Sequence, residues 1–322
     1  MERVKNWTPR KVVVVGAGAV GSTFAYALAQ TGLADEIALI DKDRQFAEGQ
    51  VLDLSHGQPF FPAVKIHIGD DQDYADAQVI VMTAGAKQRP GQNRLDLLHE
   101  NVRIVKGVVA EIVGRNSDAV LLVVTNPVDV LTYFAAKQCG WERGRVLGSG
   151  TVLDTARLRH ILARRLQIAV HNVHAYVLGE HGDSEFVPWS LAHVAGMSID
   201  DHCPVCGMCE CREETRDAIE KEVRDSAYHI IDYKGATHFG VGLSLVRIVG
   251  SILRNEQNVL PVSTMLDGEY GLHNVCLSVP CILSDNGVER VLESKLSEQE
   301  QQLLLRSADV LRKSIQEVDR RP

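Results

Sequence analysis

The stretch VVVVGAGAVGSTFAYALA, residues 12–29, decides the fold of this chain. Its four consecutive valines are typical of a buried β-strand, and glycines follow at 16, 18 and 21 in the spacing G-x-G-x-x-G. A single hydrophobic helix gains nothing from three glycines in six residues, whereas a strand that turns tightly into a helix needs them. We therefore expect a strand, a turn and a helix here rather than a signal peptide or a membrane span.

An acidic residue follows at the distance that a dinucleotide site requires. Asp41 comes 20 residues after Gly21, at the end of the apolar run EIALI (36–40). The glycines would let the backbone approach a pyrophosphate at the helix N-terminus, and Asp41 would accept hydrogen bonds from ribose hydroxyls. The alternative is a glycine-rich turn with a surface aspartate. Asp41 should also repel a 2′-phosphate, so we expect NAD rather than NADP, although Lys42 and Arg44 follow it.

Short apolar runs alternate with helical segments through the first half of the chain. The runs are at 12–15, 36–40, 64–68, 78–82, 119–124 and 145–148. This rhythm predicts a parallel sheet, and a helix with one apolar stripe lies between the fourth and fifth runs, at Leu98, Val102, Val105, Val109 and Ile112. With about 150 residues per domain as a guide, we expect an α/β fold: a Rossmann doubly wound parallel sheet over residues 1–149, followed by an α+β domain over 150–322.

The second half has a different pattern. We expect a helix near 152–166, a strand ending in GEHGDS (179–184), helices between 212 and 253, strands around 259–266 and 274–283, and a final helix. Ser297 and Glu300 form a capping box at the start of that last helix.

Charge and cysteine content exclude several classes of protein. The 322 residues include 34 Lys plus Arg and 42 Asp plus Glu, a net charge of −8. An acidic chain with both signs scattered along it has no electrostatic basis for binding nucleic acid or anionic membranes. The seven cysteines are an odd number, and four fall within 203–211, so a disulfide framework is not indicated. We expect a cytoplasmic protein.

Four further motifs occur in a fixed order along the chain. They are TAGAKQRPGQNRLDL (83–97), TNPVD (125–129), LDTARLR (153–159) and GEHGDS (179–184). With these motifs the sequence resembles the lactate/malate dehydrogenase family, and within it the bacterial L-lactate dehydrogenases, from the first strand to the last helix. The resemblance implies reversible hydride transfer from NADH to pyruvate, giving L-lactate, with residues 150–322 as the catalytic, substrate-binding domain.

The resemblance also assigns an acid–base group. Reduction of a ketone by hydride leaves an alkoxide that must be protonated, so a group titrating near neutrality is needed. The resemblance implies that His181 is this acid and that Asp154 orients its imidazole, although a histidine between glycines is by itself more often an ordinary loop residue. It implies that Arg157 binds the substrate carboxylate with two hydrogen bonds, where the alternative is an intrahelical ion pair with Asp154. Arg94 would polarise the ketone when a lid closes, assisted by Asn126.

Substrate choice would depend on Gln88 and Thr237. The family position of Gln88 holds Gln where the substrate carries a methyl group and Arg where it carries a second carboxylate, and Thr237 also matches the lactate form. A neutral amide supplies no counter-charge for a dianion. The rivals are a malate or other 2-hydroxy-acid dehydrogenase and a non-catalytic NAD-binding protein.

The resemblance supplies two more sets of residues. The expected cofactor contacts are Gly16, Gly18, Val20, Gly21, Asp41, Gly85, Ala86, Thr125, Asn126 and Ser149. Arg159 and His174 match the residues that bind fructose-1,6-bisphosphate in allosteric bacterial members, where the alternative is two unrelated surface residues. The resemblance also implies a homotetramer.

One segment departs from the family pattern. CPVCGMCEC places Cys203, Cys206, Cys209 and Cys211 in a surface loop. A metal site or redox switch is one interpretation, but two ligands only two residues apart would strain tetrahedral closure around one ion. We expect an oxidation-prone loop and no metal site. The other cysteines, Cys139, Cys276 and Cys281, lie in apolar runs and are expected in the core.

Overall fold

The computed structural model describes residues 9–86, 93–201 and 213–320. Its centre is a nine-stranded sheet in the order β12-β11-β10-β6-β5-β4-β1-β2-β3. The strands of the sheet are β1 (Lys11–Val15), β2 (Glu36–Ile40), β3 (Lys65–Ile68), β4 (Val79–Met82), β5 (Val120–Val123), β6 (Val146–Gly148), β10 (Asn258–Asp267), β11 (His273–Ser284) and β12 (Gly287–Val291).

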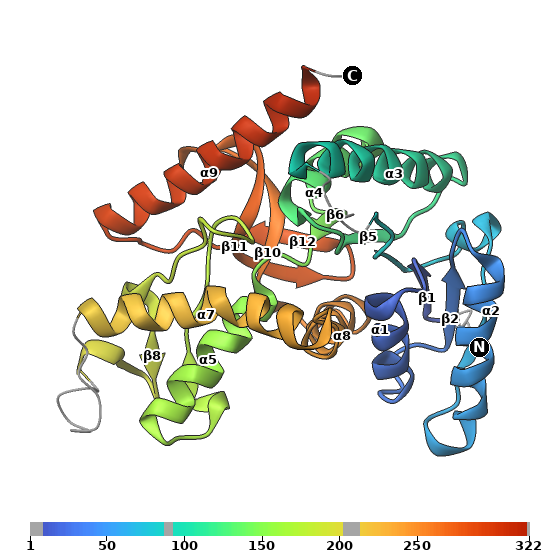
Figure 1. Ribbon diagram of the computed structural model, residues 1–322, viewed down its shortest axis with the longest axis horizontal. Helices are drawn as coiled ribbons and strands as arrows, with labels where there is room; N and C mark the ends of the chain where they lie inside the picture. The colour runs from blue at the N-terminus through green and yellow to red at the C-terminus, as the bar shows by residue number, and fades with distance from the viewer. Residues whose placement is uncertain (1–8, 87–92, 202–212, 321–322) are drawn as a thin grey trace, which may run out of the picture.

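The six apolar runs of the first half form six parallel strands, as predicted. The valines of β1 pair with β2 on one side and with β4 on the other, and every residue of β1 is buried. Such continuous apolar strands require cover on both faces of the sheet. Figure 1 shows α3 (Arg94–Gly114) and α4 (Val128–Cys139) on one face and α1 (Ala19–Ala29) and α8 (Phe239–Leu253) on the other.

The second half extends the same sheet instead of building a separate one. β10 runs antiparallel to β6, with Ser263 opposite Gly148, and β11 and β12 follow as antiparallel neighbours. The strand β12 was not anticipated. The predicted strand ending in GEHGDS does not form as a continuous strand: Val173–His174 form the short strand β7, and after it Leu178 with Phe186 and Gly179 with Ser278 make isolated bridges.

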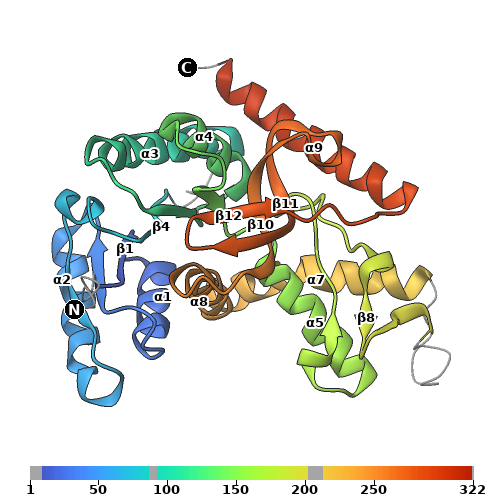
Figure 2. The same ribbon diagram turned by 180° about the vertical axis from the view of Figure 1, so that it is seen from behind.

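The remaining helices and strands flank this sheet. They are α2 (Arg44–His56), α5 (Val152–Leu166), α7 (Glu213–Lys234), α9 (Glu298–Asp319) and a small sheet of β7 (Val173–His174), β8 (His193–Val194) and β9 (Met197–Ser198). Figures 1 and 2 both show α5 beside α7 and β8. α9 begins at the predicted capping box of Ser297 and Glu300, and α5 has the predicted bounds.

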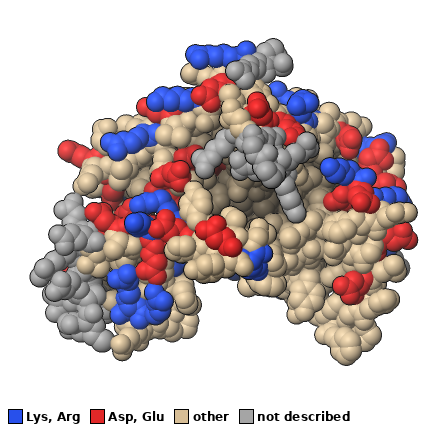
Figure 3. Space-filling model, in the orientation of Figure 1, with Lys and Arg blue, Asp and Glu red and all other residues tan. Residues whose placement is uncertain are grey.

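The cysteines divide between the core and a segment outside the description. Cys139, Cys276 and Cys281 are free and buried, which confirms the expectation for them. The four cysteines between 203 and 211 lie outside the described residues. Within the described ranges, no helix combines the length and the apolar character needed to cross a membrane. Figure 3 shows basic and acidic side chains interspersed over the face that it presents.

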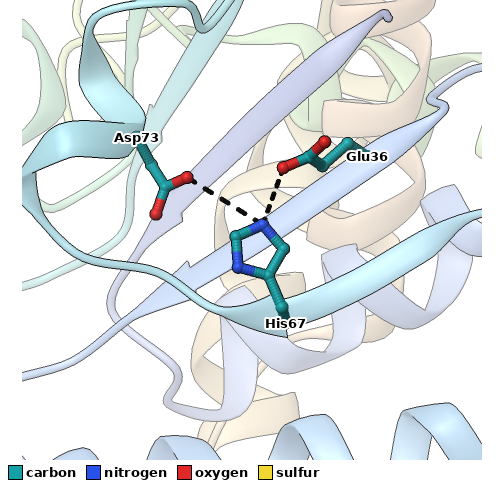
Figure 4. Close-up of side chains that lie close together, drawn as sticks. All are labelled: Glu36, His67 and Asp73. Carbon is teal, nitrogen blue, oxygen red and sulfur yellow. Dashed lines mark hydrogen bonds and ion pairs between the residues drawn. The ribbon is translucent and has the colours of Figure 1, made fainter.

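A cluster of charged side chains joins the amino-terminal ends of the first three strands. The buried ammonium of Lys11 lies 2.6 Å from Asp73 Oδ1 and 2.7 Å from Asp76 Oδ1. His67 Nε2 lies 2.8 Å from Glu36 Oε1 and 3.9 Å from Asp73 Oδ1, as Figure 4 shows. Although burial opposes ionisation of Asp73, its hydrogen bond from Lys11 lowers the pKa of the carboxyl. Because Lys11 already supplies a cation to these carboxylates, we interpret the cluster as a structural ion-pair network.

Candidate active site

The glycine turn lies at the carboxyl end of β1 and is closed to side chains at two positions. Gly16 has φ +103°, and a Cβ there would lie 2.7 Å from the backbone nitrogen of Ala84. A Cβ on Gly21 would lie 1.9 Å from the carbonyl oxygen of Gly16. Gly18 is the N-cap of α1, has no side-chain cap and faces open space. The backbone N–H groups at this helix N-terminus therefore remain available to an anion such as a pyrophosphate.

Asp41 lies beside this turn, at the end of β2. Its Oδ2 accepts a hydrogen bond from the backbone N–H of Ala17 at 2.8 Å, and its Oδ1 accepts one from Asp43 at 3.0 Å. The carboxylate therefore fixes the loop that follows Gly16, and it lies at the sheet edge where a ribose would follow the pyrophosphate.

The ends of β4 and β5 are tied together by a residue that the sequence motifs did not single out. The buried amide of Asn101 accepts from the N–H of Ala86 at 2.7 Å and donates to the carbonyl oxygen of Asn126 at 3.0 Å. Thr125 Oγ1 donates to Ala84 O at 2.7 Å. Asn101 was not predicted, because it lies in α3, which the sequence identified only as a helix with an apolar stripe. A polar residue next to Val102 of that stripe could have indicated it.

The other expected cofactor contacts lie along the same edge. Val20 is in the first turn of α1, Gly85 follows β4, and Ser149 follows β6 and donates its N–H to Val123 O at 2.8 Å. Since the carboxyl ends of parallel strands share one edge of the sheet, these positions lie near the edge at which ligands of such sheets usually bind.

A histidine, an aspartate and an arginine meet next to this edge. His181 Nδ1 lies 2.6 Å from Asp154 Oδ2, and Asp154 Oδ1 accepts from Arg157 Nη1 at 2.5 Å. Asp154 and Arg157 both lie on α5, three residues apart. The Asp154 side chain is 3% exposed, whereas the imidazole is 26% exposed. The carboxylate accepts the Nδ1 proton, so that Nε2 is the nitrogen left to exchange a proton with a ligand.

These contacts favour the charged form of each member of the pair. Burial opposes protonation of the imidazole, but the nearby Asp154 carboxylate outweighs it and raises the pKa of His181 to about 9. Burial likewise opposes ionisation of Asp154, but the charges of His181 and Arg157 outweigh it and lower the pKa of Asp154. The imidazolium is therefore the form present at neutral pH, as an acid in ketone reduction must be.

Neighbouring elements hold the loop that carries His181. The backbone N–H of His181 donates to Asp129 Oδ2 at 2.7 Å, and the N–H of Glu180 donates to Ser307 Oγ on α9 at 2.7 Å. Asp129 is 2% exposed, and burial raises its pKa to about 6. The sequence reasoning missed Asp129, although a carboxylate within the apolar start of α4 was a visible signal.

The other expected substrate residues are not all part of this cluster. Gln88 lies outside the described residues, and so does the side chain of Arg94, the first residue of α3. Thr237 lies in the turn between α7 and α8. Gly240, near that turn, lies against Leu153, which precedes Asp154 in the chain. The turn is therefore close to the start of α5.

Arg159 lies on α5 and His174 on β7, and neither belongs to the hydrogen-bonded series of His181, Asp154 and Arg157. Arg159 Nε donates to the carbonyl oxygen of Ala175 at 2.9 Å, and its guanidinium lies over the ring of Tyr176, 5.4 Å from the centroid. His174 is exposed on β7, where it pairs with His193 of β8. Burial lowers the pKa of Arg159.

The site combines the features of a dinucleotide-dependent dehydrogenase: a glycine turn, an acidic residue after β2 and a His–Asp pair at one sheet edge. Family comparison agrees with this class. Residues 10–148 match the NAD binding domain of lactate/malate dehydrogenases, and residues 151–321 match their alpha/beta C-terminal domain. The chain belongs to the lactate/malate dehydrogenase family.

Individual relatives are similar over nearly the whole chain. The L-lactate dehydrogenase of Treponema denticola is 57% identical over 311 residues, 96% of this chain and 98% of that protein. The L-lactate dehydrogenase of Acetivibrio thermocellus is 48% identical, covering 98% of this chain and 99% of that protein. A crystal structure of a lactate dehydrogenase from a Medee basin deep-sea metagenome library has a TM-score of 0.94 at 44% identity and covers 97% of this chain and 100% of that one.

Proposed function

We propose that this protein is an NAD-dependent L-lactate dehydrogenase, which interconverts pyruvate, NADH and H⁺ with L-lactate and NAD⁺. The observation that carries the proposal is the 2.6 Å hydrogen bond between His181 Nδ1 and Asp154 Oδ2. The similarity of the chain to L-lactate dehydrogenases supports it. A bare dinucleotide-binding module would need neither an acid nor a carboxylate to orient it.

In this mechanism His181 donates the proton. Bound NADH supplies the hydride that reduces the carbonyl carbon of pyruvate. His181 Nε2 gives its proton to the carbonyl oxygen, while Asp154 keeps the Nδ1 proton and stabilises the imidazolium before transfer. Lactate oxidation reverses these steps, with neutral His181 as the base. Arg157, held by Asp154 at 2.5 Å, keeps further N–H groups for the substrate carboxylate.

Further residues complete the proposed substrate site. Arg94 and Asn126 would donate hydrogen bonds to the carbonyl oxygen and favour the charge that develops on it. Gln88 and Thr237 would form the wall against the methyl group of pyruvate. Because both are neutral, a second carboxylate at that position would be buried without a counter-charge.

The cofactor proposal is NAD bound across the glycine turn, with the family's NAD-binding match as support. Backbone N–H groups around Gly18 would bind the pyrophosphate at the start of α1. The carboxylate of Asp41 would accept hydrogen bonds from the adenosine ribose. We place the boundary between the cofactor and substrate domains at residues 149 and 150, between the two family matches. A reducing compartment such as the cytoplasm suits the free thiols of Cys139, Cys276 and Cys281.

We also propose activation by fructose-1,6-bisphosphate in a homotetramer. Arg159 donates to the carbonyl oxygen of Ala175, the residue after His174, so two potential cations lie in one region of the fold, a combination that suits phosphate. Large apolar side chains are exposed on neighbouring helices, which favours burial against other subunits. They are Tyr26, Phe46, Leu52, Tyr228, Ile231, Tyr233, Phe239 and Leu243.

The test is a spectrophotometric screen of NADH oxidation. Pyruvate, oxaloacetate and branched 2-oxo acids are compared at matched concentrations, each with NADH and NADPH, and with or without fructose-1,6-bisphosphate. Pyruvate with NADH should give the highest kcat/KM. A higher kcat/KM with oxaloacetate or a branched acid would reassign the substrate, and absence of turnover with every acid would favour a non-catalytic NAD-binding protein.

A further inference from the structure

A second carboxyl group lies beside the His181–Asp154 pair. Glu185 follows His181 by four residues, and its side chain is only 6% exposed. A carboxyl oxygen of Glu185, a ring nitrogen of His181 and a carboxyl oxygen of Asp154 all lie within 4.8 Å of one another. The imidazole is therefore close to two carboxyl groups, of which Asp154 makes the hydrogen bond.

The backbone of Glu185 is fixed by the loop and by a neighbouring helix. Its N–H donates to Gly182 O at 3.2 Å, and its carbonyl oxygen accepts from Arg224 Nη1 of α7 at 3.4 Å. The next residue, Phe186, exchanges two backbone hydrogen bonds with Leu178, at 2.9 and 3.1 Å. The backbone that carries Glu185 is thus fixed relative to the loop of His181 and to α7.

Charged groups from three elements act on the Glu185 carboxyl. Asp154 and Arg157 come from α5, Arg224 comes from α7, and His181 comes from its own loop. Two more carboxylates act on these groups rather than on Glu185 directly. Asp129 of α4 acts on His181, and Glu220 of α7 lies 3.5 Å from Arg224 Nη1.

These surroundings disfavour the ionised form of Glu185. Burial raises the pKa of its carboxyl to about 9, and the charge of Asp154 adds to this effect. His181, Arg157 and Arg224 act in the opposite direction but do not reverse the shift. Glu185 is accordingly neutral at pH 7 and becomes an anion only in alkaline solution.

The charge state of Glu185 affects the imidazole directly. An ionised Glu185 adds a negative charge next to His181, whereas a neutral Glu185 does not. That charge attracts the proton on His181.

We propose that Glu185, whose carboxyl lies beside the imidazole of His181, is a positioning residue that sets how strongly the imidazole retains its proton. The inference rests on the proposed role of His181 as the acid. It extends that role, because the pH range over which pyruvate is reduced then depends on a carboxyl group outside the His–Asp pair.

The test is the pH profile of the Glu185→Gln variant, which keeps the size of the side chain and removes its charge. The kcat/KM for pyruvate at pH 7 should change by less than about threefold. The alkaline fall of kcat/KM should shift to lower pH by about half to one unit. The rise of lactate oxidation with pH should move down by a similar amount, because both limbs report deprotonation of His181. In the Glu185→Asp variant, which keeps a carboxyl group, kcat/KM should fall at a pH between those of the parent and Glu185→Gln.

Controls separate this inference from its alternatives. Glu220→Gln removes another carboxyl near Arg224, but one that is not part of the His181 cluster, and its profile should match that of the parent. Superimposable profiles for Glu185→Gln and the parent, or an equal shift in Glu220→Gln, would overturn the inference. If His181→Asn retains turnover, the proposed acid itself is wrong, whatever Glu185 does.

A second measurement covers a variant that proves unstable. Diethyl pyrocarbonate reacts with neutral imidazole, so the rate at which it inactivates the NADH-bound enzyme follows deprotonation of His181. The midpoint of that rate against pH should be lower in both Glu185→Gln and Glu185→Ala than in the parent. Unchanged midpoints in both variants would contradict the role of Glu185.

Discussion

His181 shows how far a motif can predict a site and where it stops. The GEHGDS and LDTARLR motifs predicted that His181, Asp154 and Arg157 would act together, and they form a continuous hydrogen-bonded series. Asp129 and Glu185 were not predicted, although Asp129 ends the TNPVD motif and Glu185 directly follows GEHGDS, because neither motif indicates which side chains lie beside His181 in the fold. Their effect on His181 arises from tertiary contacts that bring α4 and the loop together.

The first prediction at this scale concerns the proton itself. His181→Asn should bind NADH as the parent does but lose pyruvate turnover by about 10²–10⁴-fold, the range for removing a general acid. Stopped-flow NADH binding and steady-state rates measure the two effects separately. A variant within a few-fold of the parent in kcat would show that another group supplies the proton.

The second prediction concerns selectivity. Gln88→Arg should move the ratio of kcat/KM for pyruvate and oxaloacetate toward oxaloacetate by on the order of 10⁴, because the new charge pairs with one substrate and stays unpaired with the other. Both substrates are assayed in the same buffer, with Gln88→Lys as a control that keeps the charge but not the planar fork. An unchanged ratio for both variants would assign selectivity to a different residue.

At the scale of elements, the strength of the local pattern decided what could be predicted. The strands β1 to β6 were predictable because they are continuous apolar runs buried on both faces. The segment before His181 was expected as a strand, but it forms only the two-residue strand β7 and isolated bridges at Leu178 and Gly179. The reason is that Thr151 and Thr155 of the α5 region take the backbone groups of Val177 that a strand partner would use.

Helix α9 offers a prediction about stability. The buried carboxylate of Glu300 accepts from Ser297 N at 2.8 Å and from Ser190 N at 2.9 Å and Ser190 Oγ at 2.5 Å, so it joins a helix start to a distant loop. Glu300→Ala should lower the free energy of unfolding by about 1–3 kcal/mol. Urea unfolding at fixed protein concentration measures this, with exposed Glu298→Ala as the matched control.

The stabilisation by Glu300 should depend on pH in a definite direction. Burial opposes ionisation of this carboxyl, but hydrogen bonds from Ser190 outweigh it and lower its pKa. A carboxyl with a lowered pKa stabilises the fold above its unfolded pKa, and this contribution is lost as the pH falls. The difference between the parent and Glu300→Ala should therefore shrink on acidification, and a constant difference would contradict an ionic role.

At the scale of the whole molecule, the sequence predicted two domains but not their connection. The strands of the second half were recognised individually as β10 and β11. The pairing of β10 with β6, which adds both strands to the first sheet, could not be predicted, because alternation of apolar residues does not specify which sheet edge a strand joins.

The last prediction concerns regulation of the assembly. Fructose-1,6-bisphosphate should lower the pyruvate concentration needed for half-maximal rate, with a coupling free energy of about 1–3 kcal/mol. Arg159→Gln should abolish this effect and leave kcat at saturating pyruvate unchanged, since Arg159 is not among the proposed substrate contacts. Saturation curves at dilute enzyme, with sedimentation to follow assembly, make the measurement. Superimposable curves for the parent, with and without the bisphosphate, would remove the regulatory proposal and leave the dehydrogenase assignment intact.

The antiparallel pairing of β10 with β6 has a consequence for dividing the chain. Ser263 of β10 pairs with Gly148 of β6, and Val288 N donates to Gly144 O at 2.9 Å, so backbone pairing crosses the proposed boundary at more than one place. A fragment ending at residue 149 would expose β6 as an unprotected edge strand, which is a template for aggregation. The cofactor half is therefore a poor independent module, and exchanging halves between relatives requires the edge residues of both partners to be transferred together.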